Sequence, residues 1–250
     1  FVYKRRPVAL PVAARELGVG YLLEGSVRKA GNRVRVTAQL IDGASGGHLW
    51  AGKFDRDLTD IFAIQDEITA AIVEQLRVRL VPEEKAAIGQ VPTDNVEAYN
   101  LYLQGRYYFH NPTKAFLRLA RIMFTRAIEL DPEFARAYAG IANCDARLVG
   151  WYGEKVPPDE ILATAGKAVQ LNPRLAEAFA ARGEALRVAG RNDEAIEAFE
   201  QALSLDPDCF DASLAYGRIC RALGRFEDST AYFIRALEVQ PDDYQAPIVL

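Results

Sequence analysis

The chain has 250 residues, of which 50% are hydrophobic and 26% are charged, and its formal net charge is −4. This length is enough for two compact units, and no apolar run approaches the 18 residues that indicate a membrane-spanning helix. The charge is uneven, with +3 over residues 1–80 and −7 over residues 81–250. The basic cluster Lys4-Arg5-Arg6 is short, so we interpret it as solvated surface rather than a nucleic-acid site.

The first 82 residues predict a small α+β unit. Residues 12–17 are typical of a short helix, and residues 21–54 alternate apolar and polar residues as strands do. Turns are expected at residues 30–32 and 43–47, where glycines gather. A helix is then expected from Asp60, with these residues buried: Ile61, Ile64, Ile68, Ile72 and Leu76. We therefore predict a three-stranded antiparallel meander with helices on one face, followed by a linker over residues 83–94.

The rest of the chain contains an internal repeat. Pro173, Pro207 and Pro241 lie 34 residues apart, and a related phrase ends at Pro132, which is 41 residues before Pro173. Each proline follows a phrase that begins with Ala and ends in Asn, Asp or Gln, and it should end a helix, because proline cannot continue one. A small–Phe–Ala pattern spaced i, i+4, i+7 precedes three of the prolines and indicates one buried helix face. It occurs at Ala120-Phe124-Ala127, Ala195-Phe199-Ala202 and Ser229-Phe233-Ala236.

This period and its proline-ended phrase resemble the tetratricopeptide repeat (TPR). The resemblance implies pairs of antiparallel helices that stack into an all-α superhelix with a concave surface. In the third copy we expect helices over residues 176–188 and 194–205, separated at Gly190. About four copies fill residues 95–250, and a fifth begins at Tyr244 and stops at Leu250. Because of this, and because the first residue is Phe, we expect an internal piece of a longer protein.

A second resemblance concerns the amino-terminal unit. The strings Tyr21-Leu-Leu-Glu-Gly-Ser-Val27, Arg33-Val-Arg-Val-Thr-Ala-Gln-Leu-Ile-Asp42 and Ile61-Phe-Ala-Ile-Gln-Asp-Glu-Ile68 look like the TolB-amino-terminal-like region that precedes TPR arrays in bacterial signalling proteins. The resemblance implies a partial domain of this kind over residues 1–82. It also implies an effector domain upstream, most often a class III adenylate/guanylate cyclase. The alternatives are a winged-helix DNA-binding domain and a protein kinase.

The residue types that usually form catalytic, cofactor or metal sites are not arranged in a recognisable motif in this sequence. The glycines from Gly18 to Gly25 lead into a strand rather than a helix, so they do not form a dinucleotide loop. His48 and His110 lie in different units, and the Asp55/Asp57/Asp60 group lacks calcium-loop spacing. We interpret the cysteines as buried thiols without metal spacing: Cys144, Cys209 and Cys220. We expect no catalytic residue, no cofactor and no metal in this chain.

The predicted site is a groove for a protein or peptide partner. First helices of each TPR pair line the concave surface, and aromatic and arginine side chains are common binding anchors. The groove residues expected from this placement are Tyr99, Tyr102, Arg106, Phe109, Arg136, Asn143, Arg147, Arg187, Arg218 and Arg221. If the partner segment carries carboxylates, the periodic arginines should bind it together.

We therefore predict a non-catalytic interaction region of a bacterial signalling protein in the cytoplasm. The lysine–asparagine clamp of chaperone-binding TPRs is not reproduced, since Ala139 and Ala180 stand where lysine is needed. We expect neither nucleic-acid binding nor a membrane span in this region, and self-association is left open.

Overall fold

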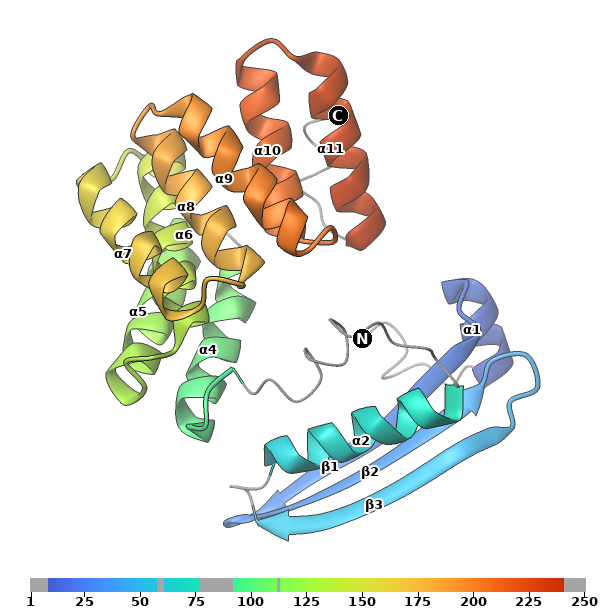
Figure 1. Cartoon of the computed structure of the whole chain (residues 1–250). Helices are drawn as coiled ribbons and strands as arrows, with labels where there is room; N and C mark the ends of the chain where they lie inside the picture. The colour runs from blue at the N-terminus through green and yellow to red at the C-terminus, as the bar shows by residue number, and fades with distance from the viewer. Residues whose placement is uncertain (1–8, 58–60, 77–91, 112, 241–250) are drawn as a thin grey trace. The chain divides into compact units, whose positions relative to one another are not determined.

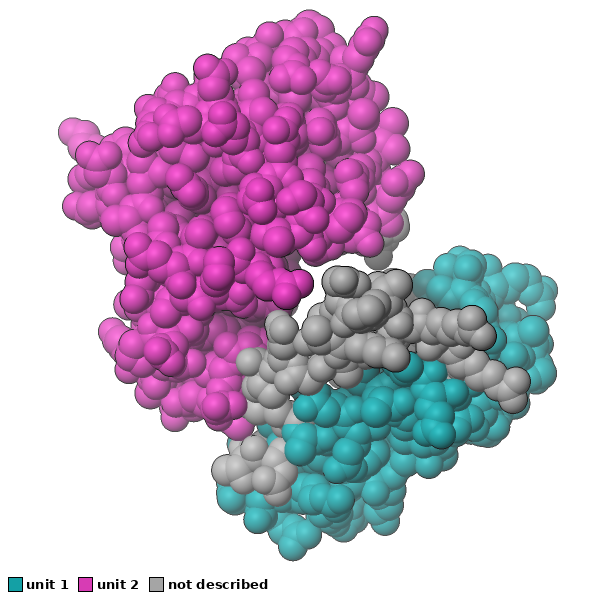
Figure 2. Space-filling view, viewed as in Figure 1, with its two compact units in different colours: residues 1–91 teal, residues 92–250 magenta. Residues whose placement is uncertain are grey.

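The structure, a computed structural model, describes residues 9–57, 61–76, 92–111 and 113–240, without the side chains of Phe62 and Leu76. Contacts divide the chain into two units, Phe1–Val91 and Pro92–Leu250 (Figure 2). The predicted helix start at Asp60, most of the predicted linker and the incomplete repeat after Tyr244 lie outside the described residues.

The first unit is the predicted α+β unit. Its three strands form one antiparallel sheet in the order β1-β2-β3, with helices α1 and α2 beside it (Figure 1). The bounds are α1 Leu10–Leu17, β1 Tyr21–Ala30, β2 Arg33–Asp42, β3 His48–Asp57 and α2 Ile61–Leu76. Gly31, at φ +60°, turns β1 into β2, a conformation that glycine adopts without steric cost.

The core of this unit lies between α2 and one face of the sheet. Alternate residues of β2 are buried, from Val34 to Leu40. Ile64 of α2 packs on Val34 and Val36, as the amphipathic pattern predicted. The same face continues onto β1, because the strand register places Val27 opposite Val36. Yet Val27 is 68% exposed, since α2 packs on β2 and β3 within the described residues.

The second unit is a series of helix hairpins. Four pairs of consecutive helices, α4–α5, α6–α7, α8–α9 and α10–α11, pack against one another along the chain (Figure 1). The bounds are α4 Val96–Phe109, α5 Lys114–Leu130, α6 Ala135–Tyr152, α7 Pro158–Leu171, α8 Ala176–Val188, α9 Asn192–Leu205, α10 Phe210–Ala222 and α11 Phe226–Val239. The predicted all-helical repeat fold is therefore confirmed, and α8 has the predicted bounds.

The repeated Asn-Pro and Asp-Pro pairs have a local function at the ends of hairpins. Asp131, Asn172 and Asp206 each follow the last residue of a second helix. Each accepts a hydrogen bond at its side-chain Oδ1 from the backbone N–H two residues later, at 2.9–3.0 Å. This turn supplies a partner for the chain that leaves the helix, and the intervening proline prevents the helix from continuing.

The repeated phenylalanines fill the space that glycines leave within hairpins. Phe124, Phe199 and Phe233 are at most 1% exposed. A Cβ atom placed on Gly183 would lie 2.4 Å from the Phe199 ring, and one on Gly217 would lie 2.6 Å from the Phe233 ring. The helices of a pair can approach this closely because the first helix has no side chain at the contact.

Candidate peptide-binding groove

The first helices of the four hairpins lie side by side. α4 contacts α6, α6 contacts α8, and α8 contacts α10. Their shared surface contains a narrow depression, which we call the groove. It is lined by Tyr102, Arg106, Phe109, Phe124, Arg136, Ala139, Gly140, Asn143, Glu177 and Asp211. The fold thus gathers residues from five helices, and five of these residues belong to the predicted site.

Ion pairs connect different first helices across the groove. Arg136 of α6 lies 3.6 Å from Glu177 of α8. Arg147 of α6 lies 3.6 Å from Asp211 of α10. Arg187 instead binds Glu184 within α8, through two hydrogen bonds of 2.8 and 3.0 Å. The groove therefore contains carboxylates that were outside the predicted site set.

An aromatic group forms the α4 side of the groove. The Tyr102 ring stacks on that of Tyr99, with 6.3 Å between ring centroids. Arg106 donates to the Tyr102 hydroxyl at 3.2 Å and lies 3.1 Å from Nε2 of His110. These contacts hold the Arg106 guanidinium in place beside the rings. His110 is thus part of the polar network of this wall.

Arg147 is the most enclosed arginine of the predicted set. Only 7% of the residue is exposed, and its guanidinium carbon lies 3.7 Å from the Phe109 ring centroid. Trp151, one turn further along α6, lies between two arginines, with centroid distances of 5.3 Å to Arg147 and 5.1 Å to Arg218. Such cation–π contacts stabilise guanidinium groups away from water.

The positive charges of the neighbouring arginines disfavour the protonated form of Arg218. The pKa of Arg218 is lowered to about 10, first by burial and then by the positive charges of the neighbouring Arg147 and Arg187. Glu184 and Asp211 act in the opposite direction. An arginine ordinarily titrates far above this range, so the lowered pKa reflects burial in a cationic surrounding.

Two features of the site differ from the sequence prediction. The second copy, between Pro132 and Pro173, is seven residues longer than the 34-residue period, and its inserted residues lie around Trp151. The structure places Trp151 in α6, which runs to Tyr152 and ends at Gly153 in the left-handed conformation. The insertion itself was the available signal, since extra residues after a groove helix can extend it. Arg221, in the last turn of α10, is exposed rather than enclosed with the other arginines.

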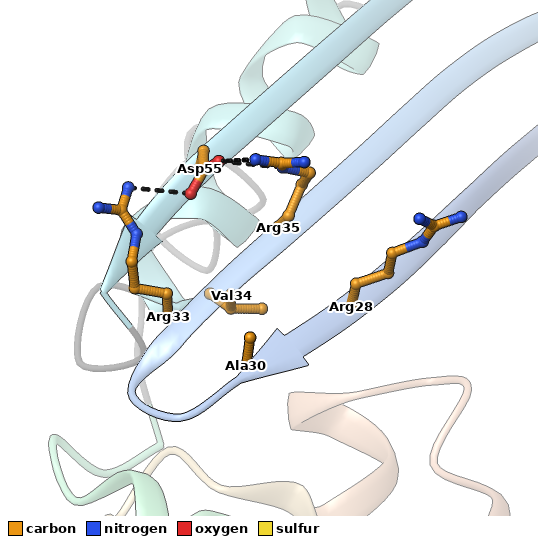
Figure 3. Close-up of a pocket in the computed structure, with 6 residues that line it drawn as sticks. All are labelled: Arg28, Ala30, Arg33, Val34, Arg35 and Asp55. Carbon is orange, nitrogen blue, oxygen red and sulfur yellow. Dashed lines mark hydrogen bonds and ion pairs between the residues drawn. The ribbon is translucent and has the colours of Figure 1, made fainter.

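A second depression lies on the sheet, and its charged side chains come from the face opposite the buried valines. Arg28, Ala30, Arg33, Val34, Arg35 and Asp55 line it (Figure 3). Asp55 accepts hydrogen bonds from Arg33 and Arg35, each at 2.9 Å, and these two guanidinium groups hold its pKa below the usual value. Arg28 lies opposite Arg35 in the strand register. This depression is exposed, and two of its three arginines already share a carboxylate.

The three cysteines are buried, as predicted, and each is a free thiol. Burial raises the pKa of Cys209 to about 12, which disfavours a reactive thiolate. Among the described residues, no group of three His, Cys, Asp or Glu is placed to hold a metal ion. In the same part of the chain, no helix is long and apolar enough to cross a membrane.

The geometry defines a protein of repeated helical hairpins, with a depression on the surface that their first helices share. The tetratricopeptide repeat family model matches residues 180–246. This match assigns residues 180–246 to tetratricopeptide repeats, and the hairpins before them have the same helix-pair arrangement.

A curated protein matches part of the chain. Over 142 residues the chain is 44% identical to the protein named "Putative adenylate cyclase 3" of Rhizobium meliloti (strain 1021). The match covers 57% of this chain and 24% of that protein, so the chain spans a minor part of the length of its relative.

Solved TPR structures resemble the chain at low identity. A thermophilic TPR protein of Thermus thermophilus is 18% identical with a TM-score of 0.48, and the match covers 76% of this chain and 95% of that one. The first TPR of Spaghetti (RPAP3), bound to the HSP90 peptide SRMEEVD, is 24% identical with a TM-score of 0.41. That match covers 54% of this chain and 98% of the other.

Proposed function

We propose that this chain is a non-catalytic interaction region whose groove binds an extended segment of a protein partner. The observation that carries the proposal is the convergence of Tyr102, Arg106, Phe109, Arg136 and Asn143 on one depression between consecutive first helices. Aromatic and arginine side chains at a concave surface are the usual anchors of protein recognition. A TPR superhelix presents such a surface to a partner.

We also propose that the region regulates a bacterial signalling protein, and that the effector of this protein is an adenylate or guanylate cyclase. The 44% identity with a protein named as an adenylate cyclase supports this assignment. So does the resemblance of the amino-terminal strings to a region that accompanies cyclases. A winged-helix regulator or a protein kinase is the alternative effector, and a cytoplasmic location is part of the same proposal.

A steric block tests the groove without changing net charge. Arg136 and Glu177 form an ion pair, so replacing both by Trp fills the groove and removes one charge of each sign. The matched control replaces Arg191 and Glu194, an exposed ion pair at a hairpin turn, by Trp. Partners captured from a lysate of the source bacterium are quantified by mass spectrometry. The groove variant should lose partners that the control retains, and equal capture by both variants would refute the groove.

The effector assignment has its own test. The whole protein that carries this chain is purified and assayed for conversion of ATP or GTP to a cyclic nucleotide, for binding to DNA and for protein phosphorylation. Cyclic nucleotide formation supports the cyclase, and DNA binding or protein phosphorylation supports the alternative. The 250-residue chain alone should turn over neither nucleotide, and turnover by it would contradict a non-catalytic role.

A further inference from the structure

The depression on the sheet carries an excess of positive charge. Three arginines line it, Arg28 from β1 and Arg33 and Arg35 from β2, and Asp55 is the only acid among the described residues that line it. Figure 3 shows Asp55 between the guanidinium groups of Arg33 and Arg35, with Arg28 on the neighbouring strand. Because one carboxylate stands against three guanidinium groups, two positive charges of the depression are not compensated there.

The register of the sheet places two of these cations directly opposite each other. Arg28 pairs with Arg35 across β1 and β2, and Arg35 pairs with Asp55 across β2 and β3. Like charges that lie directly opposite each other destabilise a pair of strands. Within the described residues, Arg28 forms no hydrogen bond and no ion pair that would offset this repulsion. The Arg28–Arg35 pair is therefore a position where an added anion would be stabilising.

Asp55 holds two of the guanidinium groups in place and leaves most of their donors accessible. Its Oδ1 accepts from Nη2 of Arg33 and its Oδ2 accepts from Nε of Arg35, each at 2.9 Å. Nη2 of Arg35 donates to the same Oδ2. These bonds use one of the five N–H donors of Arg33 and two of those of Arg35. The side chains of Arg33 and Arg35 are 65% and 52% exposed, so the remaining donors are open to a ligand.

Neighbouring positions on this face of the sheet add a hydroxyl donor but no net charge. Lys53 and Asp57 of β3 lie on the same face, and their charges offset each other. In the row beside Arg28, the hydroxyl oxygens of Ser26 and Thr37 lie 2.9 Å apart. One of these two hydroxyls donates to the other, so the accepting hydroxyl keeps its own O–H for a further acceptor. The excess of two positive charges therefore remains.

We propose that this depression binds the phosphate group of a phosphate monoester, with Arg28 and Arg35 as its main donors. A phosphate monoester carries about −1.5 to −2 charges at neutral pH, which matches the excess of two guanidinium groups. Guanidinium groups donate paired N–H bonds to phosphate oxygens. A carboxylate, with a single charge, would neutralise only half of the excess. The depression belongs to the first unit and the groove to the second, so this binding does not depend on the proposed groove.

Backbone amide NMR of the full 250-residue chain measures this binding. The chain is titrated with three phosphate sources, which are inorganic phosphate, adenosine monophosphate and an acetylated, amidated alanine pentapeptide with a central phosphoserine. The same pentapeptide with a central Glu supplies a single charge. At least one phosphate source should shift the amides of Ala30, Val34 and Arg35 saturably, about tenfold more tightly than the Glu peptide.

The tightest of the three sources identifies where the phosphate group comes from: a free ion, a nucleotide or a phosphorylated protein segment. The absence of a saturable shift at these amides with every phosphate source would overturn the proposal. Equal affinity for the Glu peptide and for the best phosphate source would also overturn it, because the depression would then not select for two charges.

Two charge-removing variants of β1 complete the test. Arg28→Gln should weaken the best phosphate source by about tenfold or more, since hydrogen bonds between charged groups contribute on that scale. Lys29→Gln removes the same charge from the adjacent exposed residue, which points to the other face of the strand, and should leave the affinity nearly unchanged. Equal weakening by both variants would show that net charge, rather than the depression, attracts the ligand. If Arg28→Gln does not fold, Arg33→Gln takes its place, and unchanged affinity in the folded variant rejects the site.

Discussion

At the scale of single residues, first helices need glycine where a phenylalanine ring of the second helix packs directly against their backbone. The Phe199 ring occupies the volume where Gly183 would carry a side chain. Gly166 of α7 is also inside a helix, yet a Cβ atom there would meet nothing within 4 Å. Replacing Gly183 by alanine therefore tests packing, whereas replacing Gly166 by alanine tests only the low helix propensity of glycine.

We expect Gly183→Ala to destabilise the second unit by about 1–3 kcal/mol, because the added methyl group overpacks the interface with Phe199. Gly166→Ala should raise stability by roughly 0.5–1 kcal/mol, since alanine loses less backbone entropy in a helix. Urea denaturation followed by circular dichroism measures both. A neutral or stabilising Gly183→Ala would contradict the close approach of α8 and α9.

Asp55 is a second position where a residue-scale prediction is possible. Its folded pKa is lowered by hydrogen bonds from Arg35 first and from Arg33 second, relative to the ordinary value of 3.8. A depressed carboxyl pKa contributes stability above pH 3.8, and this contribution disappears as the pH falls through the lower folded pKa. Removing Arg35 should therefore move the Asp55 midpoint upward.

The measurement is an NMR titration of the Asp55 carboxyl carbon. The parent should titrate below 3.8, and Arg35→Gln should shift the midpoint toward the ordinary value. Lys53→Gln, an equal charge change at an exposed position on the same strand, is the control. A midpoint that responds equally to both variants would show that net charge, rather than the hydrogen bonds, lowers the pKa.

At the scale of elements, the alanines near the ends of second helices control how hairpins stack. Ala202 of α9 is fully buried and packs with Ala176, Ala180 and Ala212 from the first helices on either side. Ser204, on the same helix, is exposed. The register of the repeat thus predicts that a large side chain is tolerated at position 204 and not at position 202.

We expect Ala202→Trp to lower the free energy of unfolding by about 1–3 kcal/mol or more, because an indole cannot fit a dense helix junction. Ser204→Trp should change it by less than about 0.5 kcal/mol, as exposed substitutions usually do. Thermal unfolding measured by circular dichroism compares the variants. Equal midpoints for parent and Ala202→Trp would show that the repeat register is wrong.

At the scale of the whole molecule, the two units have cores of different size. Within the part of the first unit that the structure describes, the cluster under α2 contains three buried residues, Val34, Val36 and Ile64. The helical unit contains several larger clusters that run from α4 to α11. Because stability follows buried apolar area, the first unit should unfold at a lower denaturant concentration.

The two tryptophans make this prediction testable, since Trp50 lies on β3 and Trp151 lies on α6. Urea unfolding is followed by emission in Trp50→Phe and Trp151→Phe variants, each of which reports one unit. The Trp50 signal should have the lower midpoint. Coincident transitions in the two variants would mean that the chain unfolds as a single cooperative body.

The sequence by itself determined the elements that depend on local chemistry. The 34-residue period, the prolines after each hairpin and the alternation of β2 predicted the two fold classes and the bounds of α8. Helix α9 begins at Asn192 rather than Glu194, because Asn192 and Asp193 complete its first turn. These patterns arise from interactions between residues that are close in sequence, so the sequence alone is enough to predict the elements they form.

Only the tertiary structure decided which charges meet and which apolar residues are covered. Arg147 and Asp211 come from α6 and α10, and their approach depends on how three successive hairpins stack. Trp151 reaches two arginines because α6 extends to Tyr152, into the beginning of the inserted residues. Val27 alternates like a buried strand residue but is exposed, since α2 packs on the other two strands. These outcomes depend on non-local packing, which a local pattern does not encode.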